Sequence, residues 1–473
     1  MSFCEEKPGK SMKKALIHLN IGFVVGILSV LLIYLVASQR SAVTTCAVAT
    51  TVAQLITDKQ LIKEILVKLV SACTISPIAD KQLNQGSGES SEKGKVVYNT
   101  KGYYSETCEV DGDVRINSTA LTVSLVPTSW SEHREWRIRP YSRKTMPDVK
   151  MVTVTQLQDK AAAPACTVTY SVPAVLFALG GLTGNFWHDF TDVLVPLFIA
   201  SRRYAGEVQF LITNMRPWYP VAYKTILQGL SKYDVVDLDD DAHVRCFPHV
   251  TVGIHQHRDL GIIPEWSPGG RLATPDFTRF VREVYALPRD APASLVREPG
   301  RRPRLLLIHR GHSRRFMNRQ EILRAAEAAG FEAVAMDLRR DVTVDEQARV
   351  VNSFDVLLGV HGAGLTNLLF LPPGAVLIQV VPYGKMDVIA TLEFGEPAKE
   401  MGLRYLDYSV TAEESTLLEM LGSEHPAIKH PGAIHRSGWD KMTEFYLDKQ
   451  SVRINIARFT ATLTQAFDYL RQQ

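Results

Sequence analysis

A short glycine-rich turn is the stretch of this chain whose residues most plainly suggest ligand chemistry. The apolar run 356–360 predicts a buried strand, His361-Gly362-Ala363-Gly364 follows it, and residues 365–370 predict the start of a helix. Glycine lets the backbone approach a ligand closely, and a helix N-terminus offers unpaired N–H groups with partial positive charge. The pattern predicts a phosphate or diphosphate site, with a plain tight turn as the alternative. It is not a dinucleotide fingerprint, because Asn367 stands where the third glycine belongs.

A second group of candidate residues is the basic loop from Arg310 to Arg315, which follows a predicted strand at 304–309. Guanidinium groups make planar, bidentate hydrogen bonds to phosphate that an ammonium group cannot make. The glycine turn follows a later strand of the same predicted sheet, and ligands bind at the carboxyl ends of such strands. Arg310 and Arg314 are therefore candidates to converge on a diphosphate. A solvated basic loop is the alternative.

A third candidate is the pair formed by His188 and Asp192. The two residues are four positions apart, so on a helix they share one face and the carboxylate can orient the imidazole. The alternative is a buried pair that only joins the helix to a sheet. Pro196 falls inside the same helical pattern and predicts a kink or an early end.

An acidic cluster, Asp237 and Asp239 to Asp241, resembles a metal-binding D-x-D motif. Such a cluster at the end of a predicted strand is more often a solvated turn, so we predict no metal site there. The six cysteines have no metal-ligand spacing either, and their pairing is left open.

The elements that must position these residues alternate between strand and helix. After a linker rich in Pro and Arg at 288–303, parallel strands joined by helices predict a Rossmann-like domain over 304–440. The pair Thr343 and Glu346 predicts a capping box inside it. Residues 96–287 show a similar α/β pattern, and residues 441–473 predict a long C-terminal helical segment.

The N-terminus predicts a membrane anchor. Residues 15–37 are nearly all apolar, and at roughly 1.5 Å per residue such a helix spans about 33 Å, enough to cross a bilayer. Four lysines precede it, which puts residues 1–14 in the cytosol. A cleaved signal peptide is the alternative. Residues 38–95 predict a stem and flexible linker.

The whole composition sets further limits. A chain of 473 residues that is 46% hydrophobic can bury more than one core. The formal net charge of +3 is small for this size, so nothing demands a nucleic acid or another polyanionic partner.

Three motifs together, in this order, give a family resemblance. The segment from Gly184 to Asp192 resembles the G-N-x-x-H-D-F-x-D motif of the plant glycosyltransferases of family sixty-one. Arg310, Arg314 and Asn318 match that family's R-x-x-x-R-x-x-x-N motif, and residues 361–384 look like its most characteristic signature. The run 136–144, Trp-Arg-Ile-Arg-Pro-Tyr-Ser-Arg-Lys, further resembles the grass xylan arabinosyl- and xylosyltransferase branch.

The resemblance implies a fold and a function. The fold would be the α/β GT-B type, with two Rossmann-like domains facing a cleft, an N-terminal transmembrane helix and a stem. The protein would be an inverting, single-pass type II Golgi membrane enzyme with a lumenal catalytic part, a signal anchor and a glycosylation sequon at Asn117. It would transfer a pentose, arabinofuranose or xylose, from a UDP-sugar to the xylan backbone of cell-wall arabinoxylan, without a metal or other cofactor.

The expected partners are a UDP-pentose donor, a xylan or xylo-oligosaccharide acceptor and the Golgi membrane, and a homo- or hetero-oligomer with other Golgi transferases is compatible with the resemblance. Among the site residues, His188 is the expected catalytic base with Asp192 orienting it, and Asp189 or Asp192 acting directly is the runner-up. The expected donor-binding residues are Arg310, Arg314, Asn318, His361, Gly362, Ala363, Gly364, Thr366 and Asn367. The alternative function is a catalytically silent family member that binds glycan or serves as a scaffold subunit of a Golgi xylan-synthesis complex.

Overall fold

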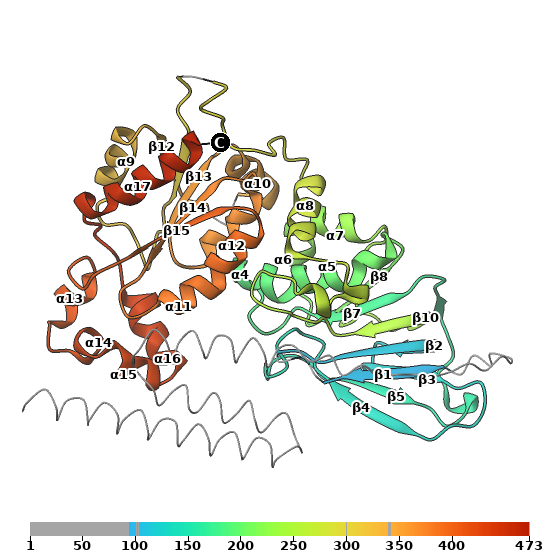
Figure 1. Ribbon diagram of the computed structural model, residues 1–473. Helices are drawn as coiled ribbons and strands as arrows, with labels where there is room; N and C mark the ends of the chain where they lie inside the picture. The colour runs from blue at the N-terminus through green and yellow to red at the C-terminus, as the bar shows by residue number, and fades with distance from the viewer. Residues whose placement is uncertain (1–93, 101, 103, 299, 339–341, 473) are drawn as a thin grey trace, which may run out of the picture. The chain divides into compact units, whose positions relative to one another are not determined.

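A computed structural model describes residues 94–472, apart from 101, 103, 299 and 339–341 (Figure 1). Ser90–Gln473 forms one compact unit. The predicted cytosolic tail, membrane anchor and nearly all of the stem lie outside the described residues. Within the described part of the chain, none of the helices combines the length and hydropathy needed to cross a bilayer.

The second half of this unit is built on a five-stranded parallel sheet, and the sequence predicts its parallel arrangement and four of its strands. The spatial order is β12-β11-β13-β14-β15, so the order reverses between β11 and β13. Ligands of open α/β sheets bind at such a switch point, beyond the carboxyl ends of the strands. The strands are β11 (Arg304–Ile308), β12 (Glu332–Met336), β13 (Val356–Val360), β14 (Val376–Val381) and β15 (Arg404–Ser409), of which β15 was not predicted.

Helices cover both faces of this sheet (Figure 1). Alternate strand residues point to opposite faces, so Leu305 packs with helices α9 and α17 whereas Leu306 packs on the side of α10 and α12. The predicted capping box is confirmed, since Thr343 Oγ1 accepts from the Glu346 N–H at 3.2 Å and the Glu346 carboxylate accepts from the Thr343 N–H. The helices are α9 (Arg319–Ala328), α10 (Val344–Asn352), η6 (Ala363–Phe370), α11 (Asp387–Ala390), η7 (Thr391–Gly395), α12 (Glu396–Glu400), α13 (Thr416–Leu421), α14 (Pro426–Lys429), α15 (Pro431–Arg436) and α17 (Ile456–Arg471).

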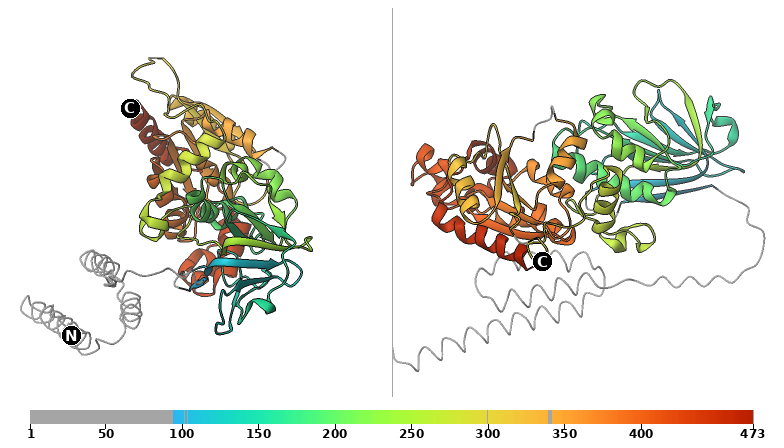
Figure 2. Two further views of the ribbon diagram at one scale, coloured as in Figure 1. Left: turned by 90° about the vertical axis from the view of Figure 1, so that its right-hand side faces the viewer. Right: turned by 90° about the horizontal axis from the view of Figure 1, so that it is seen from above.

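The first half contains a ten-stranded mixed sheet in which only part follows the predicted parallel pattern. Strands β10, β7, β8 and β9 are parallel neighbours, but β10 also pairs antiparallel with β2. Figure 2 shows the early blue strands beside the yellow-green strand in this one sheet. The strands are β1 (Lys95–Asn99), β2 (Thr107–Asn117), β3 (Thr122–Val126), β4 (Arg134–Ile138), β5 (Val152–Gln156), β6 (Val168–Thr169), β7 (Ala174–Ala178), β8 (Gln209–Thr213), β9 (Val236–Asp237) and β10 (Val244–Val252).

A continuous helical run follows β7 and carries the predicted His–Asp pair. It consists of α4 (Phe186–His188), the π-helical turn η2 (Asp189–Leu194) and α5 (Val195–Ser201). The early end predicted at Pro196 is wrong, because the helix changes its hydrogen-bond register in η2 and continues through the proline. Helices α6 (Trp218–Ala222), α7 (Lys224–Leu230) and α8 (Thr274–Val284), with the short turns η1 (Lys160–Ala162), η3 (Arg202–Tyr204), η4 (Pro264–Trp266) and η5 (Pro268–Gly270), complete this half.

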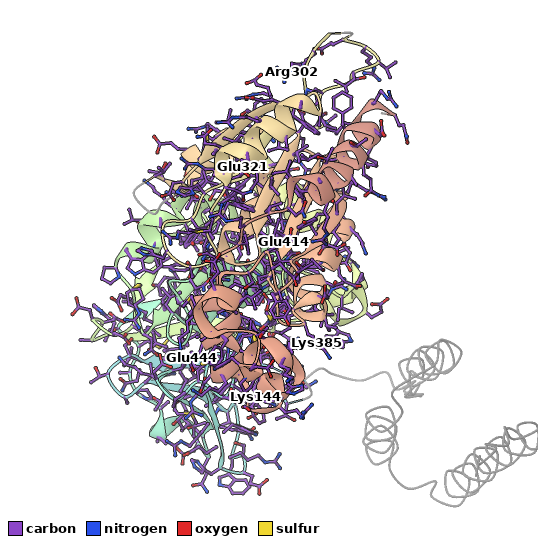
Figure 3. All side chains as sticks on the ribbon, turned by 90° about the vertical axis from the view of Figure 1, so that its left-hand side faces the viewer. Lys144, Arg302, Glu321, Lys385, Glu414 and Glu444 are labelled. Atoms are coloured by element: carbon purple, nitrogen blue, oxygen red, sulfur yellow. A yellow bond between two sulfur atoms is a disulfide. The ribbon has the colours of Figure 1, made fainter. Side chains whose placement is uncertain are left out.

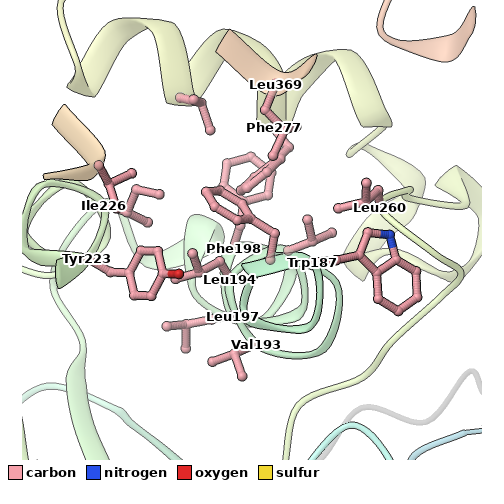
Figure 4. Packing of buried hydrophobic residues seen from close by; sticks show 14 of the residues in the cluster. Trp187, Val193, Leu194, Leu197, Phe198, Tyr223, Ile226, Leu260, Phe277 and Leu369 are labelled. Carbon is pink, nitrogen blue, oxygen red and sulfur yellow. The ribbon is translucent and has the colours of Figure 1, made fainter. Parts of the chain in front are cut away.

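One hydrophobic cluster joins the two halves. It contains residues of the first sheet and its helices together with Leu369 and Phe370 of η6, and Figure 4 shows Leu369 beside Phe277 of α8. The ring centroids of Phe190 and Phe370 are 6.3 Å apart. An ion pair between Arg258 and Glu400 adds a polar connection. The helix that begins at the glycine turn is therefore packed against the helical run that carries His188.

The predicted single helical segment at 441–473 is interrupted. Helices α16 (Trp439–Met442) and η8 (Thr443–Lys449) end before residues 450–455, which are extended. Val452 and Ile454 are buried in this segment, and Val452 forms bridges to Phe316 and Ser415. The alternation of buried and exposed side chains favours an extended segment over a helix. Glu414, labelled in Figure 3, fixes the start of α17 by accepting from the Asn455 N–H at 2.7 Å.

A disulfide joins Cys166 to Cys246 of strand β10, with the two Cα atoms 5.9 Å apart. This bond connects residues 80 positions apart and holds the segment before β6 against the sheet. Cys108 is buried and free.

Candidate active site

The glycine turn and the arginine loop meet at the switch point of the second sheet, as the sequence predicts. Gly362 has φ 138°, a region that favours glycine. A side chain at this position would place its Cβ 2.5 Å from Arg314 Nη1 and 3.0 Å from Arg310 Nη1. The two guanidinium groups therefore converge on the turn, and only glycine leaves room for them.

Arg314 is held in this position by its backbone and by its side chain. Its Nη1 donates to the His361 carbonyl oxygen at 2.9 Å. Its backbone adopts the left-handed conformation, with φ 56°, and its N–H donates to the carbonyl oxygen of Gln450 at 2.6 Å. The extended segment 450–455 thus fixes the arginine loop. A left-handed backbone costs a non-glycine residue about 1–2 kcal/mol, and such strain is often found at functional sites.

The charges of Arg310 and Arg314 are only partly offset by the described residues: Asp337 acts on Arg310, and Asp448 and Glu393 act on Arg314. Across the described residues, neither Arg310 nor Arg314 forms an ion pair with a carboxylate, and Arg314 Nε is buried without a hydrogen-bond partner. Burial lowers the pKa of Arg314 to about 10, and the neighbouring charge of Arg310 adds to the effect. Burial also lowers the pKa of Arg310. Since buried charge is costly unless it is paired, this site is suited to a multiply charged anion.

The other predicted donor-binding residues shape these loops. Asn318 Oδ1 accepts from the Ile454 N–H at 3.0 Å, and its Nδ2 donates to the Ile454 carbonyl oxygen at 2.8 Å. Asn367 Nδ2 donates to the Gly364 carbonyl oxygen at 3.0 Å. Thr366 is fully buried, and its hydroxyl has no hydrogen-bond partner in the described part of the chain. Ala363 packs against the shared hydrophobic cluster. The side-chain amides of Asn318 and Asn367 therefore form hydrogen bonds with the protein backbone.

His361 is buried and held neutral. Burial lowers its pKa to about 3, with contributions from the charges of Arg314 and Arg310. Its Nδ1 is 2.8 Å from Gln379 Nε2, and Gln379 Oε1 accepts from the Tyr405 hydroxyl at 2.9 Å. Because the amide nitrogen is the donor, Nδ1 accepts and the ring proton is on Nε2.

The predicted pair of His188 and Asp192 is formed at the start of the π-helical turn. Asp192 Oδ2 accepts from His188 Nδ1 at 2.9 Å, from the Tyr141 hydroxyl at 2.8 Å and from Arg143 Nε at 2.8 Å. Burial opposes ionisation, but the hydrogen bonds from His188 and Arg143 prevail and lower the pKa of Asp192. An ionised Asp192 requires His188 to donate from Nδ1. The lone pair is then on Nε2, where the ring can accept a proton.

Asp189 has a different environment. Its side chain is buried, Oδ1 accepts from the Gly184 N–H at 2.7 Å, and Oδ2 accepts from the Tyr223 hydroxyl at 2.8 Å. These bonds hold the turn before α4 and connect it to the start of α7. The Asp192 side chain is fully buried as well. Of the three residues proposed for proton transfer, only His188 is partly exposed, at 18%.

Three site residues were not identified from the sequence. Arg143 was part of the quoted run 136–144 but had no assigned role, and Asp259 is in a polar run after β10. Burial raises the pKa of Asp259 to about 6 despite the nearby charge of Arg143. Glu393 gave no signal in the sequence. Burial raises its pKa to about 8, and the charge of Asp259 adds to the rise. The charges of Arg143 and Arg314 act in the opposite direction and lower this pKa.

The acidic cluster is tied into the first sheet. Thr213 Oγ1 donates to Asp239 Oδ1 at 2.8 Å, and Arg245 Nε donates to Asp241 Oδ2 at 2.8 Å. Burial opposes ionisation of Asp241, but hydrogen bonds, the strongest of them from Arg245, prevail and lower its pKa. Within the described ranges, no group of three or more His, Cys, Asp or Glu side chains is placed to hold a metal ion.

Comparison with known proteins identifies the family. The family model described as Glycosyltransferase 61 matches residues 186–378, which include His188, Arg314 and Gly362. An alpha-1,3-arabinosyltransferase of Oryza sativa subsp. japonica is 41% identical over 85% of this chain and 70% of its own length. The chain belongs to the glycosyltransferase 61 family. A beta-1,2-xylosyltransferase of the same organism is 42% identical over 78% of this chain and 83% of its own length. A xylan glycosyltransferase of Arabidopsis thaliana is 33% identical over 77% and 78%. The family expected from the sequence motifs is confirmed.

The raised pKa of Asp259 predicts a pH-dependent gain in stability from Asp259→Asn. In the wild type, the buried carboxyl group of Asp259 is neutral below about pH 4 and its full contribution to stability is present. This contribution is lost as the pH rises through about 6 and the group ionises. An amide at this position does not ionise. Asn also retains the oxygen that accepts from Gln256 Nε2. We expect the variant to be more stable by about 2–3 kcal/mol above pH 7 and similar to the wild type near pH 4. Urea unfolding across this range measures the difference. The exposed Asp240→Asn serves as the control, and a gain that is independent of pH would contradict the assignment.

Proposed function

We propose that this family 61 enzyme transfers a pentose from a UDP-sugar to xylan. The observation that carries the proposal is the pair Arg310 and Arg314, which has no ion-pair partner among the described residues and lies against the Gly362 turn at the switch point of a parallel sheet. A nucleoside diphosphate supplies the charge and the oxygen atoms that such a pair lacks. The names of the arabinosyl-, xylosyl- and xylan glycosyltransferase relatives support a pentose and a xylan acceptor.

The same proposal includes the GT-B arrangement and a Golgi location. The two sheets with their helices correspond to an acceptor side, which carries His188, and a donor side, which carries the arginines. The apolar run 15–37 supports a type II anchor. The disulfide between Cys166 and Cys246 supports an oxidising compartment such as the secretory pathway.

The residues suggest a direct displacement. His188 Nε2 takes the proton of an acceptor hydroxyl as its oxygen forms a bond to the anomeric carbon. The bond from that carbon to the phosphate oxygen breaks on the opposite face, and UDP leaves with the bonding electrons. Arg310 and Arg314 stabilise the developing negative charge. Asp192 holds the tautomer of His188, while Arg143 shares the same carboxylate oxygen and limits how much of its charge stabilises the imidazolium.

The first test is an activity assay on the purified full-length chain with UDP-pentoses and xylo-oligosaccharides, measuring UDP release. We propose that the arginines replace a divalent cation, so activity should survive EDTA. Loss of activity with chelation, restored by manganese, would contradict metal independence. If the chain binds UDP but releases no UDP from any of the UDP-sugars, the catalytically silent glycan-binding or scaffold alternative would be favoured.

Arg314→Lys should weaken UDP binding about tenfold or more. The variant keeps the charge but loses the planar fork and the bond to the His361 carbonyl oxygen, and charge-assisted hydrogen bonds are worth about 1.5–3 kcal/mol. Calorimetry with UDP measures the effect. Arg315→Lys is a matched control, because Arg315 is the next residue and is exposed. Equal affinities in the two variants would place the diphosphate elsewhere.

His188→Ala should lower kcat by about 10²–10⁴-fold, the usual contribution of a general base, while UDP affinity stays near that of the wild type. Asp192→Asn should reproduce part of the loss, because it removes the acceptor that orients the ring. UDP calorimetry reports whether each variant keeps a folded donor site. If a folded His188→Ala enzyme has a kcat within a few-fold of the wild type, the pair of His188 and Asp192 has only a structural role.

A further inference from the structure

Glu393 is a half-buried carboxyl group beside His361 of the glycine turn. It belongs to η7, which follows β14 and α11, and its side chain is 19% exposed. Its Oε2 is 3.5 Å from His361 Nε2. Arg314 and Arg143 both act on its charge, yet in the described part of the chain neither arginine forms an ion pair with it. A carboxyl group with a single long contact has unused bonding capacity.

The position of His361 beside Glu393 is fixed by a chain of hydrogen bonds from the sheet. Tyr405 of β15 donates to Gln379 of β14, and Gln379 donates to His361 Nδ1. The ring proton on Nε2 is therefore the one that faces Glu393. Gln379 and His361 are buried, so this chain is shielded from solvent. Such support from neighbouring strands is typical of a preorganised binding site.

The chemistry of a UDP-sugar places its pentose next to Glu393. The sugar is bonded to the β-phosphate, which lies on the arginines in the proposed complex, and the anomeric carbon must be within reach of an acceptor bound at His188. The charges of Arg314, Arg143 and Asp259 act on Glu393. Its Oε2 is 3.5 Å from Nε2 of His361, whose carbonyl oxygen accepts from Arg314, so Glu393 is close to the proposed phosphate site. A carboxyl group whose pKa is raised to about 8 is mainly protonated near neutral pH and can both donate to and accept from a sugar hydroxyl.

We propose that Glu393 binds hydroxyl groups of the donor pentose and thereby contributes to the choice of sugar. This inference rests on the proposed function, because it assumes that the UDP group lies on Arg310 and Arg314. His361 acts as a positioning residue that holds Glu393 in place.

The test compares binding of UDP with binding of UDP-xylose and UDP-arabinofuranose by calorimetry, using the full-length chain. We expect Glu393→Ala to weaken at least one UDP-pentose about tenfold while UDP affinity stays within about twofold. We expect Glu393→Gln, which keeps the shape and part of the hydrogen bonding, to lose less and to change the ratio of kcat/KM between the two donors. Glu396→Ala is the matched control, because Glu396 is exposed one helical turn further on.

Each outcome has a defined meaning. A Glu393→Ala chain that loses affinity for UDP and for both UDP-pentoses equally would show that Glu393 only supports the phosphate site, and the proposal would be overturned. Unchanged affinities and an unchanged donor ratio would overturn it as well. If Glu393→Ala does not fold, the donor ratio of Glu393→Gln decides the question by the same criterion. A wild-type chain that does not bind UDP would overturn the proposed function itself, which is a separate result.

Discussion

The close approach of Arg314 to the turn at Gly362 is the constraint on which the rest of the second half depends. The guanidinium group occupies the space that any side chain at position 362 would need. To bring it there, the backbone of Arg314 takes a left-handed conformation, and the extended segment 450–455 runs alongside to hold the loop. The interruption of the C-terminal helical segment is thus part of the site, since a continuous helix would leave the arginine loop without this support.

The charged groups of the first and second halves have different ion-pair partners. In the first half, Asp192 pairs with Arg143 and His188, and these hydrogen bonds fix its geometry. In the second half, Arg310 and Arg314 form no ion pair with a carboxylate of the described residues, although Asp337, Asp448 and Glu393 act on their charges. A paired carboxylate can orient a neighbouring ring without a ligand, whereas arginines that lack an ion-pair partner are stabilised further when an anion binds.

The shared hydrophobic cluster joins the glycine turn of the second half to the His188–Asp192 pair of the first half. Helix η6 begins at the glycine turn and ends in Phe370, which packs against Phe190 in the turn that carries Asp192. A change in the packing of either aromatic ring would therefore move the glycine turn relative to the pair of His188 and Asp192. This packing explains why residues 365–370 are apolar except for Thr366 and Asn367.

The sequence alone determined the parallel sheet of the second half, its capping box, the meeting of the arginine loop with the glycine turn, and the pairing of His188 with Asp192. These features depend on local patterns, such as strand periodicity, a spacing of four residues on a helix, and loops that follow strands of one sheet. Only the tertiary structure decided the antiparallel part of the first sheet, the extended segment 450–455, and the buried environments of Asp259 and Glu393. Strand pairing between distant segments and the desolvation of a carboxyl group are set by what packs around a residue, and neighbours in sequence do not determine that.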